Sequence, residues 1–246
     1  MLVIIKENHT GINPFLDSLA HRGEACEGAV SLSKKSPCRH LWDILYSMTA
    51  ENVNELFLLS QQGDAGGVTR LIRNGADVNG ADVNGNTPLM YAARYGFTDT
   101  ARVLIENGAD INAKNPRGMS AVAHASRNDQ AGVMRLLLSR GGDPDTPDPD
   151  GGNVLNYAAS RGYMDIVRLL VENGANINVC DNDGNTPLMC AINNKFAGII
   201  NFLIFRGTDL TIANRHNRTA MDIAREKNLM RVATDLKFKI SEMQKP

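Results

Sequence analysis

The sequence has few cysteines and no apolar run long enough to cross a membrane. Four cysteines occur in 246 residues, namely Cys26, Cys38, Cys180 and Cys190. Few thiols without close paired spacing favour a reducing compartment over a disulfide framework. The opening run Met1–Ile5 is too short for a signal-peptide core, and no stretch reaches the roughly 20 apolar residues of a membrane span. We therefore expect a cytoplasmic protein without a membrane segment, and delivery into another cell by a non-Sec route stays open.

An excess of positive charge is also absent. The chain has 26 Lys and Arg against 27 Asp and Glu, a formal net charge of −1. A general nucleic-acid binder gains most of its affinity by neutralising phosphates with basic side chains. We therefore expect no nucleic-acid partner. With 43% hydrophobic residues, the chain can nevertheless bury a substantial core.

The sequence also lacks a recognisable reaction centre. It shows no glycine-rich phosphate loop after a strand, no serine elbow and no paired-carboxylate cleft. Four residues of zinc-binding type lie near the N-terminus, but their spacings of five, twelve and two residues match no common zinc pattern: His21, Cys26, Cys38 and His40. His124 is predicted to pack between neighbouring units. We expect no catalytic residue, no metal and no cofactor.

One acidic stretch, "GGDPDTPDPDGG" (Gly141 to Gly152), resembles a calcium loop only at first sight. Its four aspartates are punctuated by three prolines. A calcium loop needs a bidentate glutamate downstream, whereas the chain continues with Asn156-Tyr157-Ala158. The prolines also stiffen the backbone where it would have to wrap the ion. A metal loop is therefore disfavoured.

What the sequence does contain is a repeat. Two independent series keep a 33-residue period: Gly75, Gly108, Gly141, Gly174 and Gly207, and Thr87, Ser120, Asn153, Thr186 and Thr219. A fixed period of this length indicates stacked supersecondary units. Four complete units start at Gly85, Gly118, Gly151 and Gly184, with partial units before and after them.

Each unit has the pattern of two short helices followed by an extended loop. Thr87 before Pro88 predicts an N-cap and a proline at the first helical position. Leu89, Ala92 and Ala93 are predicted to be buried, and Gly96 to break this helix. The second helix is predicted to bury Ala101, Val103, Leu104 and Ile105 and to end at Gly108; by the same register, Leu137 and Leu170 are buried in later units. The Asp- and Asn-rich segment 109–118, here called a finger, suits a β-turn or hairpin.

The T-P-L, A-A, L-L and N-G-A-D-V-N pattern is similar to the ankyrin repeat over Asn52 to Ile240. The resemblance implies a predominantly α fold, an ankyrin-repeat solenoid of helix-turn-helix units with short β-hairpin fingers and a concave recognition face. The histidine usual after T-P-L is replaced by Met90, Ala123, Asn156, Met189 and Asp222. We therefore expect the hydrogen bonds of that histidine to be absent. The unit beginning at Gly118 has Ser120-Ala121 in place of Thr-Pro and is predicted to be the weakest.

Within this register the acidic stretch is the finger between two repeats. Asp side chains bond their own backbone in turns and proline presets φ, so a stiffened, exposed turn is the favoured interpretation. Recognition of a basic partner is the alternative.

Three regions are predicted along the chain. Residues 1–47 form a non-repeat segment for which partial disorder, a docking role and an unfamiliar targeting signal are all open, with a capping helix near residues 39–48. Residues 48–240 form the repeat domain, with about five repeats and a C-terminal capping half-repeat. Residues 241–246 are a tail. The half-repeat places basic residues where an internal unit would be covered.

The function that follows is a non-catalytic protein–protein interaction module, acting as scaffold, regulator or inhibitor, and we expect a monomer. The alternative is a bacterial effector or enzyme with its activity in residues 1–47 and the repeats as targeting module. The resemblance implies partner contacts from Arg94, Tyr95, Arg127, Asn128, Ser160, Arg161, Asn193 and Asn194 on the helices, and from Arg117, Met119, Asp150, Asp183 and Arg215 on the fingers.

Three of these residues, Arg94, Arg127 and Arg161, lie in successive repeats and are predicted to align into a basic stripe beside Tyr95. Arg and Tyr are enriched at binding hot spots, so the stripe indicates an acidic partner surface. The alternative is that the arginines only solvate an exposed face. Reversal of all three to Glu is expected to abolish capture of the partner and to leave thermal unfolding nearly unchanged.

Overall fold

The computed structural model describes residues 54–243. The predicted boundary at residue 47, the capping helix near 39–48 and the candidate zinc ligands lie outside the described residues. At the other end the last helix continues to Met243, so the chain is still helical beyond the predicted end of the repeat domain at residue 240.

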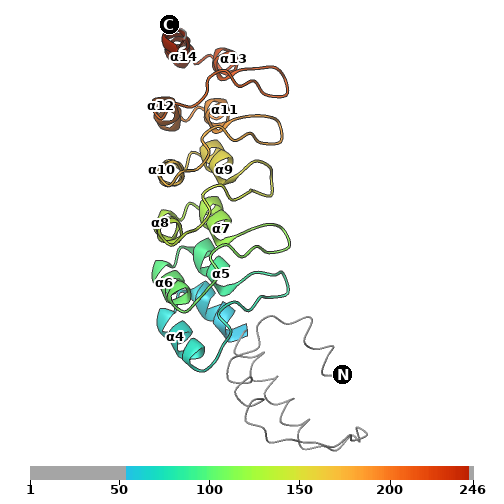
Figure 1. Ribbon diagram of the computed structural model, residues 1–246, viewed down its shortest axis with the longest axis vertical. Coiled ribbons are helices and arrows are strands. Elements are labelled where there is room, and N and C mark those ends of the chain that lie inside the picture. The colour runs from blue at the N-terminus through green and yellow to red at the C-terminus, as the bar shows by residue number, and fades with distance from the viewer. Residues whose placement is uncertain (1–53, 244–246) are drawn as a thin grey trace, which may run out of the picture.

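Helices alternate between two columns that run the length of the molecule (Figure 1). The inner column comprises residues 54–62, α5 (Pro88–Tyr95), α7 (Ala121–Arg127), α9 (Val154–Arg161), α11 (Pro187–Asn193) and α13 (Ala220–Glu226). The outer column comprises α4 (Ala65–Arg73), α6 (Thr98–Glu106), α8 (Ala131–Ser139), α10 (Met164–Glu172), α12 (Ala197–Phe205) and α14 (Met230–Met243). From α5 to α11, each inner helix packs on the next inner helix, and from α5 to α13 each packs on the outer helix of its own unit. The architecture is therefore a predominantly α solenoid, as predicted.

Polar side chains start the inner helices at the predicted positions. The side chains of Thr87, Ser120, Asn153, Thr186 and Thr219 each accept a hydrogen bond from a backbone N–H in the first turn of the helix that follows. Such caps satisfy amide groups that have no partner inside the helix. The 33-residue series read from the sequence is thus a series of helix starts.

The turn between the two helices of a unit needs a left-handed residue. Gly96 and Gly162 occupy this position with φ of 82° and 83°. Asp129, Lys195 and Asn228 stand at the equivalent positions and also have positive φ. Gly63 is the equivalent residue between residues 54–62 and α4, with φ of 79°. The turn is therefore kept in every unit, although only three units have the residue that adopts it without strain.

A single core runs between the two columns. Leu89, Leu137 and Leu170 are fully buried, as the register predicts. The prediction for the second helix was half right: Ala101 and Leu104 are buried, but Val103 and Ile105 are half-buried. Outer helices cover the core with one face only, so side chains at the edges of that face keep contact with water.

The fingers are tight loops in place of regular hairpin strands. Two backbone hydrogen bonds close each of them. In one finger the Asp82 amide donates to the Asn86 carbonyl at 3.0 Å, and the Gly85 amide donates to the Asp82 carbonyl at 2.8 Å. In residues 54–243, β-pairing is confined to two isolated antiparallel bridges, Pro147 with Asn153 and Ala213 with Thr219. Side chains complete the turn: Asp82 Oδ1 accepts from the amides of Asn84 and Asn86 at 2.8 Å each.

Side chains also tie each finger to the next. The side-chain Nδ2 of Asn79 donates to the Gly108 carbonyl at 3.0 Å, and its Oδ1 accepts from the backbone N–H of Asp110 at 2.8 Å. Asn112 repeats both bonds one unit later. Because these bonds recur with the repeat, the fingers form a row with fixed spacing. Within residues 54–243 no helix is both long enough and apolar enough to span a bilayer.

Candidate partner-binding surface

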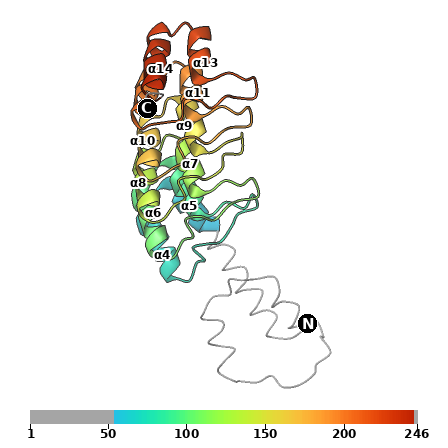
Figure 2. The ribbon, with the colours of Figure 1, turned by 45° about the horizontal axis from the view of Figure 1, so that its top comes forward.

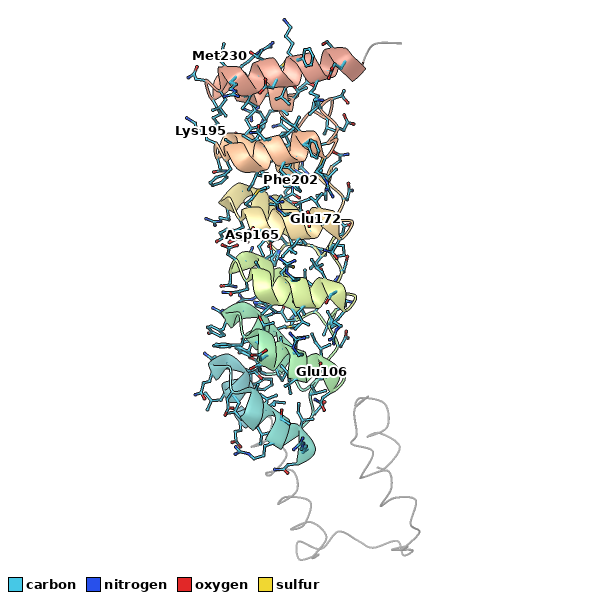
Figure 3. The ribbon with its side chains drawn as sticks, turned by 90° about the vertical axis from the view of Figure 1, so that its left-hand side faces the viewer. Glu106, Asp165, Glu172, Lys195, Phe202 and Met230 are labelled. Carbon is cyan, nitrogen blue, oxygen red and sulfur yellow. The ribbon has the colours of Figure 1, made fainter. Side chains whose placement is uncertain are left out.

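The inner helices and the fingers together form one side of the solenoid, called the inner face below. The fingers project from the inner column in both Figure 1 and Figure 2. The opposite side, formed by the outer helices, has acidic residues such as Glu106, Asp165 and Glu172 along it (Figure 3). There Phe202 lies beneath the guanidinium groups of Arg168 and Arg206, at 5.6 and 5.5 Å from its ring centre.

Most of the predicted contact residues lie on the inner face and reach solvent. The exposed members are Arg94, Tyr95, Arg117, Asn128, Asp150, Arg161, Asp183, Asn194 and Arg215; Arg127, Ser160 and Asn193 are half-buried.

Met119 does not belong to this set, because its side chain is buried with 7% of its surface exposed. It directly precedes the helix cap Ser120, where the finger returns to the core. The prediction that Met119 contacts a partner was wrong.

Arg127 is held by carboxylates, unlike the other arginines of the predicted stripe. Its Nε and one terminal nitrogen donate to the two oxygens of Asp148, each at 2.8 Å, and that nitrogen also contacts Asp150. The Asp148 side chain is buried, with 1% of its surface exposed. The hydrogen bond to Asp148 raises the pKa of Arg127. The centre of the inner face is therefore neutralised within the molecule, and the stripe is not continuous.

Tyr157 lies next to this ion pair. The guanidinium groups of Arg127 and Arg161 are 4.8 and 5.3 Å from its ring centre, within the range of cation–π contact. Arg94 lies 5.6 Å from the ring centre of Tyr95 in the same manner. Two Arg–Tyr groups therefore lie on the inner face, one on α5 and one on α9.

A small hollow opens between α5 and α7 beside Arg94. It is lined by Asn86, Met90, Tyr91, Arg94 and His124. Asp82 lies behind it, where the Tyr91 hydroxyl donates to its Oδ2 at 2.6 Å. Burial, followed by the positive charges of Arg94 and Arg127, lowers the pKa of His124 to about 4. His124 packs between units as predicted, and it also lines this hollow, which the sequence did not indicate.

The aspartates of the Gly141–Gly152 finger have structural partners. Asp143 Oδ1 accepts from the Asp145 amide at 2.9 Å, and Asp145 Oδ1 accepts from the Asn176 amide of the next finger at 2.8 Å. Thr146 and Asp148 are buried, so the prediction of an exposed turn was wrong for the middle of the stretch. Asp148 follows Asp82 and Asn115 at the 33-residue period. This spacing could have shown from the sequence that Asp148 occupies the same structural position in its finger.

Two of the substituted histidine positions, Asn156 and Asp222, still make side-chain hydrogen bonds. Asp222 Oδ2 accepts from the Thr219 backbone amide at 3.0 Å and from the Thr219 hydroxyl at 2.7 Å. The side-chain Nδ2 of Asn156 donates to the backbone carbonyls of Val179 and Asn185 at 3.3 and 3.0 Å. Its Oδ1 accepts from the backbone N–H of Asn153 at 3.2 Å. The expectation that these bonds are lost was wrong for these two repeats. An asparagine amide donates and accepts at once, so it links its own helix cap to the next finger.

Cys180 and Cys190 lie in different surroundings. Burial raises the pKa of Cys190 to about 12, which keeps its thiol protonated at neutral pH and unreactive. Cys180 is exposed and unpaired with Cys190. Among residues 54–243, no three His, Cys, Asp or Glu side chains converge on a point where an ion could bind.

Comparison with known proteins agrees with this architecture. The family model described as ankyrin repeats (3 copies) matches residues 56–148 and 122–214. A crystal structure of the ankyrin repeat protein EF0377 is 30% identical, with a TM-score of 0.69, and covers 75% of this chain and 97% of that one. An ankyrin repeat domain from Acinetobacter baumannii AYE is 27% identical, with a TM-score of 0.71 and the same coverages. No curated protein matches the chain by sequence.

Proposed function

The chain belongs to the ankyrin repeat family, and we propose from this that it is a non-catalytic protein–protein interaction module that holds its partner on the inner face. It acts as a scaffold, regulator or inhibitor, as a monomer in the cytoplasm. Members of this fold offer an extended recognition surface built from repeated units.

The two Arg–Tyr groups of the inner face carry the proposal; Arg94, Tyr95 and Arg161 are exposed and Tyr157 is half-buried. Arg94 with Tyr95, and Arg161 with Tyr157, lie on inner helices two repeats apart. Arginine and tyrosine are enriched among the interface residues whose replacement by alanine weakens binding most. The fingers add four further exposed residues to this surface: Arg117, Asp150, Asp183 and Arg215. An acidic patch on the partner fits the two arginines.

Charge reversal tests this function. Arg94→Glu combined with Arg161→Glu is expected to abolish capture of the partner from a lysate of the source cells, while the melting temperature stays within about 2 °C. Arg127 stays unchanged, because a glutamate there would face Asp148 and Asp150. The triple reversal predicted from sequence is thus replaced by a double one.

The matched control reverses Arg102 and Arg135, two exposed arginines of the outer helices. This variant is expected to capture the partner as the wild type does. Capture that survives the inner-face reversal and is lost with the outer-face reversal would place the partner on the other side. Capture lost only on deletion of residues 1–47 would favour the effector alternative.

A further inference from the structure

The hollow beside Arg94 is a small opening between two repeats, and most of its volume is open to solvent. It contains about 150 Å³ including its open mouth. Its lining comes from one finger base (Asn86), from α5 (Met90, Tyr91 and Arg94) and from α7 (His124). Two consecutive repeats therefore build it, and their packing fixes its shape.

His124, which lines the hollow, has an unsatisfied ring nitrogen. Its Nε2 is buried and has no hydrogen-bond partner among residues 54–243. A buried polar atom without a partner is destabilising, so a ligand that supplies one gains affinity. When Nε2 carries the ring proton, the atom that fits is a hydrogen-bond acceptor, and the positive charges of Arg94 and Arg127 favour an anionic one.

Arg94 supplies the charge of the pocket. Its side chain is exposed, and no carboxylate of residues 54–243 lies within ion-pair distance of it. The nearest acidic group at the hollow, Asp82, is occupied by the Tyr91 hydroxyl and by the amides of Asn84 and Asn86. Arg127, one repeat away, is by contrast compensated by Asp148 and Asp150.

We propose that this pocket binds the carboxylate of an Asp or Glu side chain of the partner protein, with Arg94 as the ion-pair donor and His124 Nε2–H as the second donor. The inference rests on the proposed function and narrows it. It makes Arg94 the anchor of the inner face, whereas Arg161, which lies over Tyr157 outside the pocket, contributes to the surrounding contacts.

A peptide probe tests the pocket directly. The full chain is titrated into a fluorescein-labelled Gly/Ser peptide that contains four glutamates, and into its glutamine counterpart, with binding read by fluorescence anisotropy at low ionic strength. The glutamate peptide is expected to bind at least about tenfold more tightly. Arg94→Gln is expected to remove about tenfold of this affinity, and the control Arg161→Gln less than about threefold.

The protonation of His124 distinguishes a carboxylate bound in the pocket from a general electrostatic attraction of the peptide. The charged and titratable groups around it are Arg94 and Tyr91 on α5, Asp82 on the finger, and Arg127 on its own helix with Asp148 and Asp150 bound to it. A carboxylate bound at Nε2 stabilises the imidazolium. Saturation with the glutamate peptide is therefore expected to raise the pKa of His124, followed by NMR, from about 4 to at least about 5.5.

Three results would overturn the inference. Equal losses of peptide affinity in Arg94→Gln and Arg161→Gln would mean that a diffuse positive field binds the peptide. An unchanged His124 pKa at saturation would place the carboxylate elsewhere. Tighter binding of a phosphoserine peptide would assign the pocket to phosphate. In each case the double reversal of Arg94 and Arg161 still reports separately on the inner face, so failure of the pocket and failure of the proposed function are distinguishable.

Discussion

At the residue scale, the pairing of Arg127 with Asp148 separates a structural arginine from two exposed arginines, Arg94 and Arg161, at similar positions in the repeat. Asp148 is buried on its finger, and the guanidinium that neutralises it comes from the preceding repeat. A buried carboxylate without its partner is strongly destabilising. Removing the arginine therefore damages the fold as well as the surface.

We expect Arg127→Gln to lower the free energy of unfolding by about 2 to 3 kcal/mol, less than for a fully buried pair because Arg127 is partly exposed. Urea denaturation followed by circular dichroism measures this. The control is Asp150→Asn, which removes the exposed member of the cluster and is expected to cost less than about 1 kcal/mol. Equal stability of Arg127→Gln and wild type would show that Asp148 finds another partner.

His124 gives the fold a dependence on pH. Its pKa is about 4 in the folded chain against an ordinary value of 6.5, so between these values the unfolded chain binds more protons. The free energy of unfolding is therefore expected to fall by about 3 kcal/mol as the pH drops from about 6.5 to about 4, and this contribution levels off below that. In His124→Asn the free energy of unfolding is expected to change less with pH over this range. An unchanged pH dependence would mean that other groups cause it.

At the element scale, the turn between the inner and outer helices shows how one position is filled in several ways. Gly162 has positive φ, and a Cβ added there would lie 2.5 Å from the Phe196 ring. Lys195 occupies the equivalent position one repeat later with φ of 63°. A lysine in the left-handed region is strained, whereas glycine is not.

We expect Lys195→Gly to stabilise the protein by about 0.5 to 1 kcal/mol, because relief of the strained backbone exceeds the entropy that glycine adds to the unfolded chain. Chemical denaturation tests it. Lys195→Ala keeps the Cβ and is the matched control, with no gain expected. If the alanine variant were the more stable of the two, strain at this turn would be negligible.

At the scale of the whole molecule, stability varies along the stack because each repeat contacts only its neighbours. The unit beginning at Gly118 starts α7 without proline and ends it at Asn128 and Asp129 in place of a left-handed glycine. Two long-range links support it: Arg127 with Asp148, and the Ser126 hydroxyl, which donates to the Val154 carbonyl at 3.2 Å.

Native-state hydrogen exchange is expected to find amides of α7 exchanging about fivefold faster than those of α5, which corresponds to about 1 kcal/mol of local stability. The α5 helix has Thr87-Pro88 at its start and Gly96 at its end. Protection in α7 equal to or greater than that in α5 would mean that the two long-range links outweigh the weaker helix ends.

The sequence by itself determined the register of the repeat and hence most of the fold. Helix caps, the Gly96 turn and the buried positions of Leu137 and Leu170 follow from local chemistry and from a 33-residue period. The same register placed Arg94 and Arg161 on the inner face. These features depend on residues close in sequence or on their equivalents one repeat away.

Only the tertiary structure decided which polar groups find each other across repeats. Arg127 meets Asp148, Asn156 reaches the Val179 and Asn185 carbonyls, and Met119 turns into the core. Each outcome depends on the course of a neighbouring finger and on the space left by packing, neither of which a single repeat specifies. For that reason the basic stripe read from the sequence became one internal ion pair and two separate exposed arginines, with the pocket beside Arg94 formed where two units meet.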